Sequence, residues 1–145
     1  MKTNKLFIGG DHAGFGLKQK FVDYLKDKGF NVTDHGTHSE DSTDYPDYAH
    51  PVADDVSKND DSLGILICGS GNGVCMTANK HKDIRAALCW NEELAALARQ
   101  HNNANVICIP SRFVEEDVAF KMLSTFLNTD FEGGRHERRV GKISC

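Results

Sequence analysis

The sequence lacks the features that mark a membrane or secreted protein. No apolar run among its 145 residues approaches the length of a membrane-spanning helix, about 18 residues. The opening segment MKTNKLFIGG leads directly into a strand-like run, without the long apolar region and small-residue cleavage site of a secretory signal. We therefore expect a cytoplasmic protein that does not contact membranes.

The sequence also lacks the common metal-binding spacings, because it contains neither a CxxC nor an HxxxH pair. We therefore expect no metal site. The number of cysteines is odd, and several of them lie in apolar runs, which is typical of reduced thiols in the cytosol. The five cysteines are Cys68, Cys75, Cys89, Cys108 and Cys145.

No strong charge imbalance is present. The formal net charge is −4, and charged residues make up 26% of an ordinary composition. This argues against disorder and against general nucleic-acid binding. Internal repeats, linkers and low-complexity segments are missing as well, so residues 1–145 are expected to form one domain.

Short apolar runs alternate with helical patterns along the chain. Strands are predicted at 5–9, 30–34, 63–68, 84–89 and 105–110. Apolar residues at helical spacing predict helices around 17–25, around 52–56 with Pro51 in the first turn, and over 91–100 and 115–127. This alternation indicates an α/β fold, a single Rossmann-like doubly wound domain. It would have a five-stranded parallel sheet, helices on both faces and a C-terminal tail.

Chemically interesting residues follow the predicted strands. The segments GGDHAGFG, CGSGNG, CWNEE and PSRF come after the first, third, fourth and fifth strands. In a parallel sheet these segments lie at the same edge, which is where such folds bind ligands. We therefore expect convergence of five residues from distant parts of the sequence: Asp11, His12, Cys68, Ser70 and Arg112.

The segment GSGNG contains Gly69, Gly71 and Gly73, whose spacing permits a loop of backbone amides that binds an anion ahead of a helix. A tight strand-to-helix turn explains the glycines equally well. The segment matches neither the dinucleotide-binding pattern nor the P-loop.

Two further features are ambiguous when taken singly. The tail at 131–142 is basic, and Arg135 and Arg139 would share a face if it is helical. They suit a phosphate, but a solvated basic tail is an equal alternative. His101 ends a predicted helix near the opposite edge of the sheet, where a lone histidine is more often a surface group.

Together these segments resemble the ribose-5-phosphate isomerase B family, which is related to galactose-6-phosphate isomerase subunits. The resemblance covers nearly the whole chain and rests on GGDHAGFGLK, DHGTHSEDSTDYPDYA, GILICGSGNGVCMTANK, IRAAL, ARQHNNANV and EGGRHERRV, in this order. It implies a cofactor-independent interconversion of aldose and ketose phosphates through an enediol. It also implies a homodimer, in some members a tetramer, whose active sites are shared between subunits.

The resemblance assigns catalytic roles as well. Cys68 matches the base of one family branch, and the glutamate that replaces it in another branch is missing from Gly73-Val74-Cys75. Loop amides and a helix N-terminus would favour its thiolate. Ser70 stands where threonine is common and would steady the enediolate together with the loop amides. His101 matches the acid that opens the furanose ring, and in a dimer it would serve the neighbouring subunit.

The remaining residues carried over by the resemblance bind substrate. Asp11 and His12 match contacts to the sugar hydroxyls and the phosphate end, and Tyr45 lines the site. The loop amides belong to Gly69, Ser70, Gly71, Asn72 and Gly73, and the other ligands are Asn102, Arg112, Arg135 and Arg139. His136 and Arg138 have no matched role and are interpreted as surface residues.

Alternatives remain at this point. The Gln-His-Asn of ARQHNNANV favours a pentose phosphate, but a six-carbon substrate such as allose 6-phosphate or galactose 6-phosphate differs by little more than a methylene. A non-catalytic phosphosugar-binding protein would need the arginines but not Cys68, Ser70 and His101 together. A thiol-redox function is disfavoured, because Cys68 and Cys75 do not form a CxxC motif.

Overall fold

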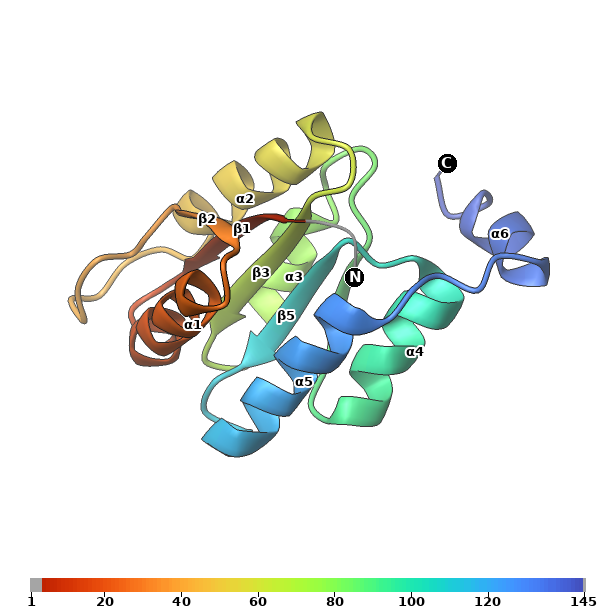
Figure 1. The fold of residues 1–145 in the computed structure, drawn as a ribbon. Coiled ribbons are helices and arrows are strands. Elements are labelled where there is room, and N and C mark those ends of the chain that lie inside the picture. Colours follow the sequence, from red (N-terminus) through yellow and green to blue (C-terminus); the bar gives the residue numbers. More distant parts are fainter. Residues whose placement is uncertain (1–3, 145) are drawn as a thin grey trace.

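Five parallel strands form one sheet in the order β2-β1-β3-β5-β4 (Figure 1). They are β1 (Lys5–Gly10), β2 (Asn31–Asp34), β3 (Leu63–Cys68), β4 (Ala86–Leu88) and β5 (Val106–Pro110). This computed structural model describes residues 4–144, so Cys145 lies outside the described residues. The parallel five-stranded sheet confirms the fold class expected from the sequence.

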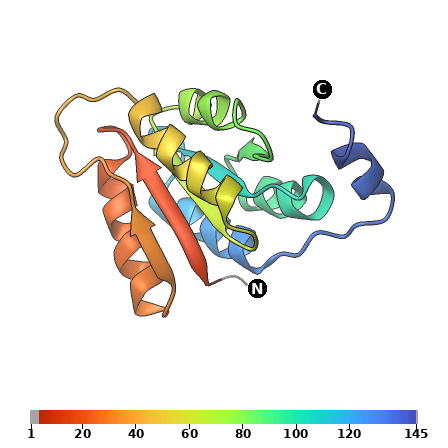
Figure 2. The ribbon, with the colours of Figure 1, turned by 90° about the horizontal axis from the view of Figure 1, so that it is seen from above.

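Helices cover both faces of the sheet (Figures 1 and 2). Helices α1 (Phe15–Asp27), α4 (Glu92–Asn102) and α5 (Glu116–Asn128) pack on one face, and α2 (Pro46–Lys58) and α3 (Asn72–Ala78) on the other. The short α6 (Arg135–Val140) follows the last core helix and lies beside the end of α4. The tail is therefore helical, and Arg135 and Arg139 are four residues apart on it.

The central strand β3 is buried along its whole length, which explains its uninterrupted apolar sequence LGILIC. Its side chains alternate between two cores. Ile65 and Ile67 belong to the core under α1, α4 and α5, whereas Leu66 and Cys68 belong to the core under α2 and α3. Cys68 is thus the last residue of a fully buried strand, and it faces the α2–α3 side of the sheet.

Two elements differ most from the sequence-based expectation. Helix α2 begins at Pro46, so Pro51 lies inside the helix and not in its first turn. Burial of Ala49, Val52 and Val56 against the sheet outweighs the hydrogen bond that Pro51 cannot donate. Strand β4 is also shorter than the predicted 84–89. The backbone N–H of Arg85 donates to the Asn105 side chain at 2.8 Å, and the pairing of β4 with β5 begins only at Ala86.

A buried ion pair connects α1 to the end of β2. Lys18 is fully buried, and its Nζ lies 2.7 Å from Oδ2 of Asp34. The other carboxylate oxygen of Asp34 accepts the backbone N–H of Gly36 at 2.8 Å. This pair therefore also holds the start of the long loop that leads to Tyr45 and α2.

Lys18→Met is expected to lower the free energy of unfolding by about 3 kcal/mol, because it leaves the Asp34 carboxylate without its buried cation. Urea unfolding followed by circular dichroism measures the change. Lys20→Met is the matched control, since Lys20 pairs with Glu116 on the exposed side of α1. That control should cost less than about 1 kcal/mol. Equal losses in the two variants would contradict a structural role for the Lys18–Asp34 pair.

Candidate active site

Three loops meet at the carboxyl edge of the sheet, beside β1 and β3. The hydroxyl of Ser111, just after β5, lies 2.8 Å from the carbonyl oxygen of Ala13 and 3.3 Å from that of Cys68. The backbone N–H of Arg112 donates to the carbonyl of Gly69 at 3.1 Å. The strand that follows β1 lies on one side of it in the sheet, and the strands that follow β3 lie on the other side. The position between β1 and β3 is therefore the switch point of the strand order, where doubly wound folds bind ligands.

The first loop lies against the backbone of β3 without an intervening side chain. A Cβ atom on Gly14 would stand 2.5 Å from the carbonyl oxygen of Ile67, closer than any side chain tolerates. The backbone N–H of Asp11 donates to that same oxygen at 3.3 Å. The loop that carries Asp11 and His12 is therefore held directly against the strand that ends in Cys68.

The loop residues Gly69 to Gly73 lie between two predicted site residues. A Cβ atom on Gly69 would stand 3.2 Å from Nη1 of Arg112, and one on Gly73 would stand 2.5 Å from the Tyr45 ring. Arg112 therefore covers the start of the loop and Tyr45 covers its end. Both side chains are exposed, so they line the site from the solvent side.

The centre of the loop presents polar groups to solvent. Ser70 and Asn72 are exposed, and the Ser70 hydroxyl accepts the backbone N–H of Asn72 at 3.3 Å. Gly71 between them is buried. Cys68, at the base of the loop, is 5% exposed. Its thiol thus lies at the buried base of a loop whose Ser70 and Asn72 residues are exposed.

Asp11 and His12 are both oriented by hydrogen bonds. The buried Asp11 accepts the backbone N–H groups of Ala13 and Gly14 on Oδ1, at 3.0 and 3.2 Å. Nδ1 of His12 accepts the backbone N–H of Thr43 at 3.1 Å. The neutral His12 ring therefore carries its proton on Nε2, which suits a donor to an anionic or hydroxyl oxygen. Thr43 had no signal in the sequence, because it acts through its backbone.

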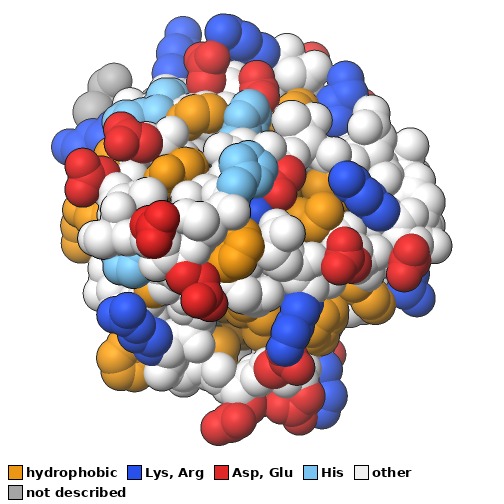
Figure 3. All heavy atoms as spheres, turned by 90° about the vertical axis from the view of Figure 1, so that its left-hand side faces the viewer, with side chains coloured by type: hydrophobic (Ala, Val, Ile, Leu, Met, Phe, Trp, Pro, Cys, Tyr) orange, Lys and Arg blue, Asp and Glu red, His pale blue; other side chains and the backbone are white. Residues whose placement is uncertain are grey.

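Figure 3 looks onto this side of the molecule. Histidine side chains gather in its upper half, and basic and acidic groups are interspersed with apolar ones. Mixed polarity of this kind, without a deep apolar cavity, suits a small polar ligand. The loops that carry the five residues expected to converge, Asp11, His12, Cys68, Ser70 and Arg112, meet at this edge. Together with Tyr45 and the rest of the Gly69–Gly73 loop, these residues form one group that we call the thiol half-site.

The neighbouring thiols differ in their acidity. Burial, and next the charge of Cys75, raises the pKa of Cys89 to about 12. Burial raises the pKa of Cys108 well above its ordinary value. Both thiols therefore stay protonated at neutral pH, and neither can act as a base. Cys75 is half-buried, and a hydrogen bond from Cys108 lowers its pKa.

The other predicted site residues lie far from this group. Helix α4 begins at the carboxyl edge and ends at Asn102 at the amino edge, beside α6 (Figures 1 and 2). The backbone N–H of Glu132 donates to the carbonyl of Gln100 at 3.1 Å, which fixes the tail to the end of α4. His101, Asn102, Arg135 and Arg139 thus form a second group, the basic half-site, and one chain does not bring the two groups together.

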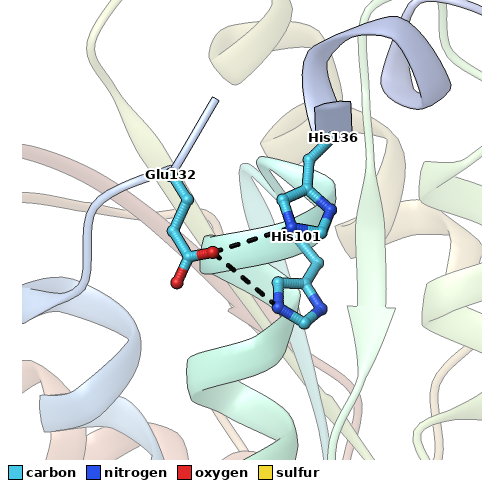
Figure 4. Close-up of side chains that lie close together, drawn as sticks. All are labelled: His101, Glu132 and His136. Atoms are coloured by element: carbon cyan, nitrogen blue, oxygen red, sulfur yellow. Dashed lines mark ion pairs between the residues drawn. The ribbon is translucent and has the colours of Figure 1, made fainter. Parts of the chain in front are cut away.

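His136 corrects an expectation from the sequence. It is not a surface residue: it is 9% exposed, and its ring stacks on that of His101 with centroids 4.2 Å apart and planes 10° apart (Figure 4). Burial, and next the neighbouring His101, lowers the pKa of His136. The sequence did contain a signal for this burial. His136 and Val140 are four residues apart, so they share the face of α6 that points away from the exposed arginines.

A polar hollow at the amino edge is a rival location. Acidic and amide residues line it together with Arg85 and Arg99. Both guanidinium groups are already engaged, because Arg85 Nε donates to the Asn103 carbonyl at 2.8 Å and Arg99 Nε to the Thr129 carbonyl at 3.1 Å. We assign these arginines to holding the loops and take the thiol half-site as the chemical centre.

The fold and the thiol half-site define an α/β enzyme domain that handles a small polar substrate. The family model described as Ribose/Galactose Isomerase matches residues 6–143, so the chain belongs to this family of sugar isomerases. Among the described residues 4–144, no helix has the length and apolarity needed to cross a membrane.

Individual members of the family are similar to this chain over nearly its whole length. The chain is 55% identical to the probable ribose-5-phosphate isomerase B of Mycoplasma genitalium over 140 residues, covering 95% of this chain and 92% of that one. It is 44% identical to ribose-5-phosphate isomerase B of Escherichia coli, covering 97% and 95% of the two chains. The crystal structure of the Mycoplasma genitalium enzyme with bound ribulose-5-phosphate shares 54% identity and a TM-score of 0.93, covering 96% and 93%. The Thermotoga maritima enzyme shares 51% identity and a TM-score of 0.93, covering 96% of each chain.

Proposed function

We propose that the chain interconverts ribose 5-phosphate and ribulose 5-phosphate through an enediol intermediate, with Cys68 as the base and His101 as the acid that opens the sugar ring. The observation that carries this proposal is the position of Cys68. It ends β3 below the Gly69–Gly73 loop, with the first loop held against the same strand. Relatives that cover nearly all of this chain are named for this reaction.

The reaction begins with ring opening. The bond between C1 and the ring oxygen breaks, the oxygen takes a proton from His101, and the C1 hydroxyl becomes a carbonyl as its proton passes to solvent. In the next step the Cys68 thiolate removes the proton from C2, and the electron pair moves onto the C1 oxygen. The proton of the O2 hydroxyl then passes to the C1 oxygen, and the O2 electron pair forms the ketone as the thiol returns its proton to C1.

The thiol half-site supplies the groups that this intermediate needs. The backbone amides of the Gly69–Gly73 loop and the exposed Ser70 hydroxyl are the groups that would stabilise the negative charge on the enediolate. Asp11 and the Nε2–H of His12 suit the sugar hydroxyls and the phosphate end. Arg112 lies over Gly69 and provides a guanidinium group at the start of the loop.

A second copy of the chain completes the site in this proposal. His101, Asn102, Arg135 and Arg139 lie at the edge opposite to Cys68, so they serve a sugar phosphate only if a partner presents them. Four large apolar side chains that are exposed in a lone chain offer surface for a second copy to cover. They are Met76, Trp90, Phe113 and Ile143.

A substrate screen tests the proposed activity. The purified protein, without added metal or cofactor, is assayed with ribose 5-phosphate, allose 6-phosphate and galactose 6-phosphate. We expect kcat/KM for the pentose to exceed that for either hexose by about tenfold or more, the discrimination that one extra carbon permits. A preference for a hexose would contradict the assigned substrate. Binding of all three sugars without turnover would make the chain a phosphosugar-binding protein.

A further inference from the structure

Three side chains meet where the tail crosses the end of α4 (Figure 4). Oε1 of Glu132 lies 3.6 Å from Nε2 of His136 and 3.9 Å from Nε2 of His101. The two rings are nearly parallel, and each presents the same nitrogen to the carboxylate. The carboxylate and both histidines come from one chain, and only His101 belongs to the catalytic groups described above.

The composition of this cluster is that of a two-histidine, one-carboxylate metal site, but its geometry is not. A metal ion lies in the plane of each imidazole that binds it. Two rings stacked with planes 10° apart direct their Nε2 lone pairs along nearly parallel lines. They cannot converge on one ion unless one ring turns out of the stack. The stack therefore favours an organic function over metal binding.

We propose that Glu132 is a positioning residue for His101, and that it acts together with His136 to present Nδ1 of His101 to the sugar ring oxygen. This inference rests on the proposed function, in which His101 opens the ring. The nitrogen of an imidazole that faces a carboxylate carries a proton, and this sets the role of the other nitrogen. Because Nε2 faces Glu132, the proton that leaves for the ring oxygen is the one on Nδ1.

Glu132 is well placed for this role. Its backbone N–H donates to the carbonyl of Gln100, the residue directly before His101, so the carboxylate and the imidazole are attached to the same point of the structure. A separation of 3.9 Å is longer than a hydrogen bond, but catalytic hydrogen bonds often shorten when substrate binds. His101 is half-exposed, which leaves its ring open to a substrate.

His136 restricts the rotation of the His101 ring. Its own ring covers one face of that imidazole, so His101 cannot rotate about its Cβ–Cγ bond without breaking the stack. The lowered pKa of His136 makes it a neutral ring at neutral pH, so the stack does not place two positive charges against each other. Glu132, Arg135 and Arg139 are the other charged groups acting on His136.

The test compares two aldose phosphates in Glu132→Ala and Glu132→Gln. Ribose 5-phosphate must be opened before it reacts. Erythrose 4-phosphate cannot form a furanose ring, because its C4 oxygen carries the phosphate. Misorientation of a catalytic group costs about 10²-fold, so we expect kcat/KM for ribose 5-phosphate to fall by that factor in Glu132→Ala. The value of kcat/KM for erythrose 4-phosphate should change less than about twofold, since Cys68 and its loop are untouched.

Matched variants make the result specific. Glu132→Gln keeps an oxygen that accepts the His101 proton, so it should lose less than Glu132→Ala. Glu137→Gln changes an exposed acid of the neighbouring helix α6 and should behave as wild type. His101→Asn sets the largest loss that ring-opening defects produce. Unchanged rates with ribose 5-phosphate in Glu132→Ala would overturn the inference, and so would equal losses with both substrates. Lack of wild-type activity with ribose 5-phosphate would instead refute the proposed function.

Discussion

A Cys68→Ala variant is expected to fold and bind sugar phosphate normally while losing roughly 10²–10⁴-fold of its turnover, the usual contribution of a general base. The substitution removes one sulfur atom from the end of β3, where the loop amides, Asp11 and Arg112 keep their places. Turnover in both directions should fall, because proton transfer between C1 and C2 occurs in each. Circular dichroism and a sugar-phosphate binding assay establish that the variant is intact.

Cys75→Ala is the control for this experiment. Cys75 is a half-buried thiol on α3, close to the same loop, and it has no part in the proposed reaction. Its removal should leave turnover within a few-fold of wild type. Alkylation gives an independent measurement: iodoacetamide should inactivate the wild-type enzyme, and bound substrate should slow the inactivation. Near-normal turnover in a folded Cys68→Ala protein would eliminate Cys68 as the base.

Mixing two inactive variants should restore activity if the site is shared between subunits. Cys68→Ala damages the thiol half-site, and Arg135→Ala/Arg139→Ala damages the basic half-site. A heterodimer of these chains contains one intact site and one site with both lesions. Random reassembly of equal amounts should therefore recover about a quarter of the wild-type turnover. Partial unfolding followed by refolding exchanges the subunits, and coupled assays measure the recovery.

The matched control mixes Cys68→Ala with His12→Ala. Both lesions then lie in the thiol half-site, so every site in a heterodimer carries one of them and no recovery is expected. Native mass spectrometry of an isotope-labelled partner establishes that the chains have exchanged. Lack of recovery in the first mixture despite proven exchange would mean that the tail arginines serve the Cys68 of their own chain.

The sequence was sufficient to predict the sheet and the thiol half-site for one physical reason. Buried parallel strands read as apolar runs, and their carboxyl ends lie at one edge. The positions of Asp11, Cys68 and Arg112, directly after strands, were therefore enough to predict that the three residues lie at the same edge. The same rule assigned His101 to the opposite edge, because α4 must cross the sheet before β5 begins.

The features that the sequence did not reveal depend on tertiary contacts. The burial of His136 arises because the tail turns back onto α4, and only the four-residue spacing of His136 and Val140 in a six-residue helix hinted at this. Thr43 contacts His12 through a backbone N–H, which no residue type specifies. The continuation of α2 through Pro51 depends on the apolar surface that the helix buries against the sheet, which outweighs the low helix propensity of an interior proline.

The contact between the first loop and Ile67 has a consequence for how the protein tolerates sequence change. Gly14 and Asp11 meet the carbonyl oxygen of Ile67 directly, so the spacing between the Asp11 carboxylate and the Cys68 thiol is set by main chain against main chain. Any side chain at position 14 is therefore expected to push the first loop away from β3, whereas a substitution in either core that keeps the strands in register should leave this contact in place.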